Sequence, residues 1–190
     1  MKRKKQNYQL EIPDDDYKLQ WLMTEDKKNF ESVDKWLYIG ADKINSRFAK
    51  IGITTGNLQS RSYSSTNPNY YLFCAFKCKH NISKVDLERV ESSILSFLDD
   101  RYVNENGETK RASHAESGVL SECFYDIDFD EMLYDIHYYI YNNHNRYFSY
   151  GGLVDDYDND CGDILDIEFN RAIVSQDRIT KCMHFLAIHR

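Results

Sequence analysis

The chain has 190 residues, of which 42% are hydrophobic and 29% are charged, and its formal net charge is −7. No apolar run approaches the roughly 18 residues of a membrane-spanning helix, so the composition excludes a transmembrane protein. With 10 Phe, 15 Tyr and only 2 Pro, the chain can bury a core, which excludes full disorder.

Charge is distributed unevenly along the chain. Residues 1–35 are neutral overall, residues 36–112 carry a net charge of +3, and residues 113–190 carry −10. The net charge of −7 argues against a purely electrostatic nucleic-acid binder, but the positive middle of the chain is suited to binding a polyanion. The five cysteines are odd in number and form no disulfide framework, and the basic N-terminus has no apolar signal stretch. We therefore expect a cytoplasmic protein.

The first 35 residues read as an arm followed by helical pieces. Residues 1–16 combine a Lys/Arg cluster with Pro13 and aspartates, which indicates a flexible arm. Within residues 17–35, Thr24 is a candidate N-cap for a helix.

Three strands are predicted next, over residues 35–42, 47–55 and 70–78. A short helix with Asn57 as its cap is expected over residues 57–65, between the second and third strands. Short connections between the strands predict a small three-stranded antiparallel sheet.

The segment 83–100 has the pattern of an amphipathic helix. Ser83 and Asp86 form a capping-box pattern, and apolar side chains recur at helical spacing. Glu91 falls on or beside the apolar stripe formed by Leu87, Val90, Ile94 and Leu98. Because burying an unpaired charge is costly, Glu91 is expected to have a partner or a function.

The rest of the chain alternates loops and short elements. Residues 100–120 read as a polar loop, 121–127 as a short strand, and 129–142 as a helix with an apolar face. Residues 149–163 read as an acidic loop, and 173–189 as a strand or a helix. The fold class is therefore α/β in the broad sense (α+β), with a small three-stranded antiparallel sheet flanked by helices and a mostly helical C-terminal extension.

The order of parts in residues 36–127 resembles the GIY-YIG nuclease superfamily. The segments LYI (37–39) and KIG (50–52) lie where that family has its two motif strands, and Arg61 and Glu91 follow in order. The segment SECF (121–124) looks like the Glu-Trp-Phe element of a phage- and virus-associated branch, which also writes its second motif with Lys. The resemblance implies domains at 1–35 (arm and helical lead-in), 36–142 (nuclease domain) and 143–190 (acidic extension).

The resemblance implies a Mg²⁺-dependent endonuclease that hydrolyses DNA. Glu91 would hold the metal, and Arg61 would grip the scissile phosphate. Tyr38 would act as the general base or orient the attacking water, with Lys50 lowering its pKa. Lys50 replaces the family's second Tyr, and Tyr63 is the aromatic residue nearest to the position after the Arg, with Arg61, Tyr63 and Lys50 as candidate substrate contacts. The cell compartment would be the host cytoplasm if the protein is viral.

Two other functions stay open. The same fold without chemistry would be a module that binds nucleic acid or a protein partner, and the −10 of residues 113–190 favours this because an acidic surface repels DNA. In one form of this binding module, the acidic region 113–190 binds a protein partner. An RNA-directed nuclease is the third possibility, since the aromatic residues can stack on unpaired bases, but DNA is favoured over RNA.

Two metal sites are weighed as alternatives. Cys74, Cys78 and His80 share one strand face, and with His114 or Cys123 they would make a zinc site of unusual spacing. Residues 156–163 resemble a calcium loop, but the glycine is one position late and position twelve is Ile167. Core cysteines and a solvated acidic loop are the simpler interpretations.

Overall fold

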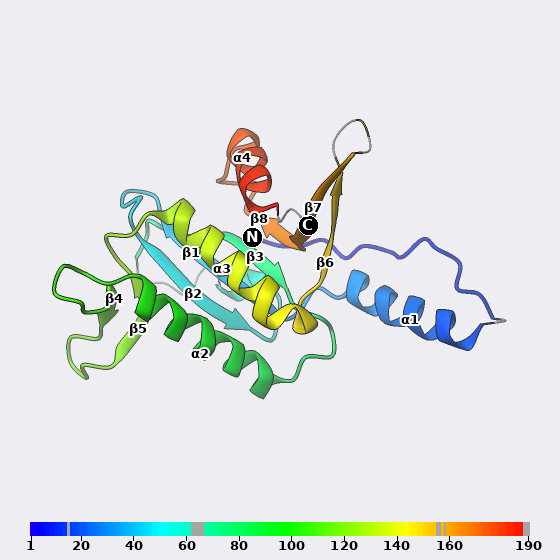
Figure 1. Ribbon diagram of the computed structural model, residues 1–190, viewed down its shortest axis with the longest axis horizontal. Helices are drawn as coiled ribbons and strands as arrows, with labels where there is room; N and C mark the ends of the chain where they lie inside the picture. The colour runs from blue at the N-terminus through cyan, green and yellow to red at the C-terminus, as the bar shows by residue number, and fades with distance from the viewer. Residues whose placement is uncertain (15, 62–66, 155–156, 158, 188–190) are drawn as a thin grey trace.

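The computed structural model describes residues 1–14, 16–61, 67–154, 157 and 159–187. The fold is of the predicted α+β class (Figure 1). The elements in chain order are α1 (Tyr17–Glu31), β1 (Trp36–Asp42), β2 (Ala49–Thr54), the 3-10 turn η1 (Leu58–Arg61), β3 (Tyr70–Lys77), α2 (Lys84–Arg101), β4 (Arg111–Ser113), β5 (Leu120–Phe124), α3 (Phe129–His144), the 3-10 turn η2 (Asn145–Tyr147), β6 (Tyr150–Val154), β7 (Asp160–Leu165), β8 (Ile167–Phe169) and α4 (Gln176–Leu186).

The main sheet is larger than the sequence predicts. Within the described ranges it has six antiparallel strands in the order β4-β5-β2-β1-β3-β8, and β6 and β7 form a separate two-stranded sheet. The three predicted strands are its centre, as β1, β2 and β3, so the prediction of a three-stranded sheet is wrong. Strands β4 and β8 have three residues each, which is too short to leave an alternating pattern in the sequence.

The two faces of the sheet have different cores. Alternate residues of β1 point to opposite faces, so Leu37 and Ile39 join a large core with the apolar faces of α2, α3 and α4. Trp36 and Tyr38 point the other way, into a smaller apolar cluster completed by Leu58, Leu72 and Ala75. Figure 1 shows α2 and α3 lying side by side across the sheet. The smaller cluster defines the face that carries Tyr38.

Helix α2 forms as its sequence predicts. The Ser83 hydroxyl accepts the Asp86 N–H at 3.0 Å, so Ser83 is confirmed as the N-cap. The Asp86 carboxylate accepts the Ser83 hydroxyl at 2.7 Å, whereas in a capping box it accepts the backbone N–H of the cap residue. The four predicted apolar positions are all buried. Helix α3 is likewise confirmed, two residues longer than expected, with Met132, Leu133 and Ile136 buried in the large core.

The N-terminal segment differs from the prediction in one respect. Helix α1 begins earlier than expected because Asp16 is its N-cap, with one carboxylate oxygen accepting the N–H groups of Lys18 and Leu19. Thr24 is therefore not a cap. It lies inside the helix, and its hydroxyl donates to the Gln20 carbonyl at 2.7 Å.

The C-terminal extension is not mostly helical. The segment predicted as an acidic loop contains β6 and most of β7, which pair with each other, and among the described residues after 143 α4 is the one helix of more than one turn. Glycines and aspartates are poor strand formers, so local propensity hides these strands and tertiary pairing forms them. The predicted domain boundaries stay predictions, although β8 pairs with β3 and joins this extension to the main sheet.

Candidate active site

The cross-strand register of β1 and β2 positions Tyr38. Tyr38 pairs with Gly52, and Gly40 pairs with Lys50. A Cβ atom added to Gly52 would lie 2.5 Å from the Tyr38 hydroxyl, so the phenol lies flat over this glycine. Gly52 therefore leaves the space that Tyr38 fills, and any larger residue there would push the phenol away.

A second tyrosine, which the sequence did not single out, lies beside the first. The ring of Tyr70 covers Gly40 so closely that a Cβ atom there would collide with it. Burial is the main cause that raises the pKa of Tyr70, and the neighbouring Tyr38 adds to it. The two glycines of β1 and β2 thus hold two phenols on one face of the sheet.

Glu91 reaches this region along the open edge of β2. Strand β5 pairs with β2 only at Ala49 and Lys50, so no strand of the described chain covers that edge beyond Lys50. There, the Ile53 backbone lies near enough to the Glu91 carboxyl group to favour its ionised form, against the larger effect of burial on its pKa. Glu91 is half-buried, and burial, followed by the charge of Glu122, raises its pKa to about 7. The inward-turned carboxylate inferred from the helical spacing is present.

Arg61 comes from the short turn after β2. The Asn57 side chain accepts the Gln59 N–H at 3.0 Å, which begins the turn η1 as predicted. Leu58 is buried in the same apolar cluster as Tyr38, so η1 is fixed on the Tyr38 face. Burial and Glu122 raise the pKa values of Tyr38 and Glu91, and the positive charge of Arg61 partly opposes both rises. Tyr63, the other predicted contact near this turn, lies outside the described residues.

Lys50, which the resemblance implies as support for the base, lies in an ion pair. Its ammonium lies 3.5 Å from a carboxylate oxygen of Glu122, with 29% of the Lys50 side chain and 45% of the Glu122 side chain exposed. Burial and the charge of Glu122 raise the pKa of Tyr38 to about 12. Burial and Glu122 therefore dominate the pKa of the phenol, Lys50 pairs with Glu122, and the supporting role of Lys50 stays a prediction.

Glu122 is the charged residue of this cluster that sequence reasoning missed. Its negative charge raises the pKa values of Tyr38, Glu91 and Tyr70, so it lies within electrostatic reach of all three. Its place follows from β5, where the neighbouring Cys123 pairs with Lys50. The only sequence signal was the segment SECF, whose family counterpart also contains a glutamate.

The predicted residues Tyr38, Lys50, Arg61 and Glu91 therefore form one cluster with Glu122 and Tyr70, which we call the β2-edge cluster. It combines two carboxylates, a guanidinium, an ammonium and two neutral phenols. The charges couple across the cluster, as the shifted pKa values of Tyr38 and Glu91 indicate. Such a set can bind a phosphate through cations, bind a hard cation through carboxylate oxygens, and orient a water.

The β2-edge cluster offers few oxygen donors for a divalent cation. No group of three or more His, Cys, Asp or Glu side chains suited to a metal occurs among the described residues. Glu91 supplies one half-buried oxygen donor, and Glu122 lies near enough to raise its pKa. Mg²⁺ keeps most of its own waters and is commonly held by one or two carboxylates together with substrate phosphates, so this donor set suits Mg²⁺ with nucleic acid bound.

The alternative metal sites gain no support. Cys74 and Cys78 are fully buried in the large core. His80 instead pairs with Glu25 of α1, with its Nε2 atom 2.8 Å from the carboxylate. In the predicted calcium loop, residues 156 and 158 lie outside the described residues.

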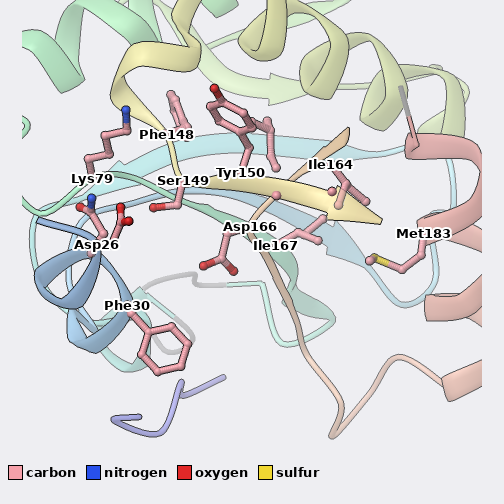
Figure 2. A pocket seen from close by; sticks show the side chains of 14 residues that line it. Asp26, Phe30, Lys79, Phe148, Ser149, Tyr150, Ile164, Asp166, Ile167 and Met183 are labelled. Carbon is pink, nitrogen blue, oxygen red and sulfur yellow. The ribbon is translucent and has the colours of Figure 1, made fainter. Parts of the chain in front are cut away.

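A cleft of about 700 Å³ lies elsewhere on the molecule. It is lined by residues of α1, the β6–β7 sheet and α4, among them Phe30, Tyr150 and Met183 (Figure 2). Lys79 and Asp26 lie at one end of it, and Asp166 points into it. None of its lining residues belongs to the β2-edge cluster. The cleft and the cluster of charged and phenolic groups are therefore two separate candidate sites. We assign the candidate site to the cluster, because polar groups of complementary function converge there.

Comparison with family models, with curated proteins and with solved structures finds no match to this chain. Among the described helices, none combines the length and the apolar character that crossing a bilayer requires.

Proposed function

We propose that this chain is a Mg²⁺-dependent endonuclease of the GIY-YIG type that hydrolyses phosphodiester bonds of DNA. The observation that carries the proposal is the placement of Tyr38, Arg61 and Glu91 from β1, η1 and α2: η1 packs through Leu58 into the apolar cluster of Tyr38, and the charges of Arg61 and Glu91 both act on the Tyr38 phenol. These residues were chosen from the sequence, through helical spacing for Glu91 and motif order for Tyr38 and Arg61, and groups chosen at random would rarely be neighbours. Their chemical types are those that phosphodiester hydrolysis needs.

Each residue has a role that follows from its surroundings. The Arg61 guanidinium offers paired N–H donors to the non-bridging oxygens of the scissile phosphate. Tyr38, with a pKa near 12, is a neutral phenol at pH 7, so it orients the attacking water through a hydrogen bond and does not act as a phenolate base. The water oxygen bonds to phosphorus and releases one proton to solvent. The bond from phosphorus to the leaving sugar oxygen breaks with its electron pair going to that oxygen, which takes up a proton from solvent.

Glu91 would hold the Mg²⁺, whose positive charge supplies stabilisation of the phosphate as negative charge develops there. The shifted pKa of Glu91, about 7, supports this role, because a carboxylate held in a costly charged state gains most from a cation. Glu122 and Lys50 form the ion pair beside it and set the local charge.

The proposal is tested by nicking of supercoiled plasmid DNA with Mg²⁺ and with a chelator. We expect cleavage only with Mg²⁺, and we expect Glu91→Ala to fold normally and to cut no DNA. A Glu91→Ala protein that cuts at the wild-type rate contradicts the assignment. Binding of DNA without any Mg²⁺-dependent nicking would favour the non-catalytic module, which the acidic residues 113–190 make the second candidate.

A further inference from the structure

The N-terminal arm packs onto the face of the sheet that carries Tyr38. Met1 packs against the small apolar cluster that contains Trp36, Tyr38 and Leu58. Met1 and Lys2 also line one small cleft together with Gln59, two residues before Arg61. The start of the arm therefore lies beside η1 and close to the β2-edge cluster.

The arm is fastened to the body at two points. The Arg3 guanidinium lies 5.6 Å from the centre of the Trp36 ring and forms a 2.8 Å ion pair with Asp166, with only 10% of its side chain exposed. Further along, the Tyr8 ring packs edge-on against Phe30 at 6.0 Å, and the Tyr8 N–H donates to Glu31 at 3.1 Å. Within the predicted flexible arm, residues 3–8 are therefore held at both ends, by the contacts of Arg3 and of Tyr8.

Three lysines near these fastening points are not used for packing. Lys2, Lys4 and Lys5 are exposed, and within the described residues none of them forms an ion pair. Arg3, by contrast, is neutralised by Asp166. The arm therefore presents three exposed ammonium groups on either side of Arg3, which lies over Trp36 on the Tyr38 face of the sheet.

The acidic excess of the chain lies partly on the opposite side. Asp130, Glu131 and Asp135 belong to α3, which covers the large core. They are engaged there by Arg178 and Arg101. Three of the fifteen acidic residues in 113–190 are thus paired on the face opposite Tyr38, so they do not add negative charge beside the arm.

We propose that the N-terminal arm is part of the DNA-binding surface, with Lys2, Lys4 and Lys5 contacting backbone phosphates that flank the scissile one. The chemistry is charge-based and independent of base sequence, so it supplies affinity and register but no sequence preference. The inference rests on the proposed function, because it assumes DNA on the Tyr38 face. Fastening at Arg3 and Tyr8 would limit the entropy lost by the lysines on binding.

The test measures duplex DNA binding at several salt concentrations, with Glu91→Gln in every protein so that the DNA stays intact. The test variant adds Lys4→Ala and Lys5→Ala. The matched control adds Lys18→Ala and Lys181→Ala, which remove two exposed lysines from α1 and α4. We expect the test variant to bind about 5- to 20-fold more weakly, with the slope of log affinity against log salt reduced by up to about 2, and the control to change little.

Equal loss in the test and control variants would overturn the arm proposal, because any two lysines would then serve. Faster plasmid nicking after Lys4→Ala and Lys5→Ala in the otherwise wild-type protein would also overturn it, since the arm would then be covering the site. If the arm variant shows the reduced salt slope but the wild-type protein never nicks DNA, the arm proposal stands and the nuclease proposal fails. If the protein binds no DNA, the arm proposal fails.

Discussion

The phenol of Tyr38 occupies the volume that a side chain at Gly52 would need. Replacing Gly52 by Ala places a Cβ atom 2.5 Å from the Tyr38 hydroxyl, so the ring must move. Because misplacement of a catalytic group by about 1 Å can cost about 100-fold in rate, we expect Gly52→Ala to lower DNA nicking about 100-fold. Gly56→Ala is the control, because nothing lies within 4 Å of its added Cβ atom. Equal activity of the two variants would contradict the proposed role of Tyr38.

The binding of Mg²⁺ should depend on pH with a midpoint near 7. Glu91 must be ionised to hold a cation, and its pKa is raised to about 7 by burial and by Glu122. Below that pH the ionised fraction falls about tenfold per pH unit, so the Mg²⁺ concentration for half-maximal nicking should rise by the same factor. Measuring Mg²⁺ dependence from acid to neutral pH checks this. A requirement for Mg²⁺ that is constant down to the ordinary pKa of Glu would exclude Glu91 as the ligand.

Removing the charge of Glu122 should shift that midpoint. Its negative charge raises the pKa of Glu91, so Glu122→Gln is expected to lower it and to strengthen Mg²⁺ binding below pH about 7. Asp177→Asn on α4 removes one negative charge from a position outside the cluster and serves as the control. Identical Mg²⁺ midpoints for the Glu122→Gln variant and the wild-type protein would show that the two carboxylates do not interact.

Glu91 should also lower the stability of the fold at neutral pH. Its pKa is higher in the folded protein than its ordinary 4.5, so the folded state binds the proton more tightly than the unfolded state. The stabilisation is therefore complete below about pH 4.5 and is lost as the pH rises through about 7. We expect Glu91→Gln to raise the free energy of unfolding at pH 8 by on the order of 1 kcal/mol, allowing for solvent screening, while abolishing nicking. Denaturant unfolding at two pH values decides this.

Ionisation of Tyr38 should not change the rate of DNA nicking at alkaline pH. Because its pKa is raised to about 12, the phenol stays protonated in the alkaline range where an ordinary tyrosine ionises. If Tyr38 orients water as a neutral group, the nicking rate should be level from about pH 8 to 10, and Tyr38→Phe should lower it at every pH. A tenfold rise per pH unit that disappears in Tyr38→Phe would instead identify a phenolate base.

The sequence predicted the parts of the site that depend on local pattern. Glu91 was found because helical spacing placed a carboxylate on an apolar stripe, and that stripe is buried as expected. Arg61 was found through its order after the second strand, and Asn57 through its capping chemistry. In each case the signal lies within one element or its immediate neighbour, where spacing alone constrains the geometry.

The missed features all depend on pairing between distant segments. Glu122 joins the cluster only because β5 pairs with β2, and the shift of the Tyr38 pKa depends on that neighbour and on burial. Tyr70 looked like an ordinary strand aromatic until the sheet register placed it over Gly40. Strand β8 was missed because its three residues are held by β3 and have no pattern of their own.

The short strand β8 has a consequence for how the protein must be handled. It pairs with Cys74, Ala75 and Phe76 of β3, in a part of that strand where every residue is buried. A version of the chain shortened before residue 167 would leave the backbone groups of β3 open along an apolar edge, which is a template for strand pairing between molecules. Such a truncated protein should aggregate even if its proposed catalytic residues are intact, because β8 covers the β3 edge in the full chain.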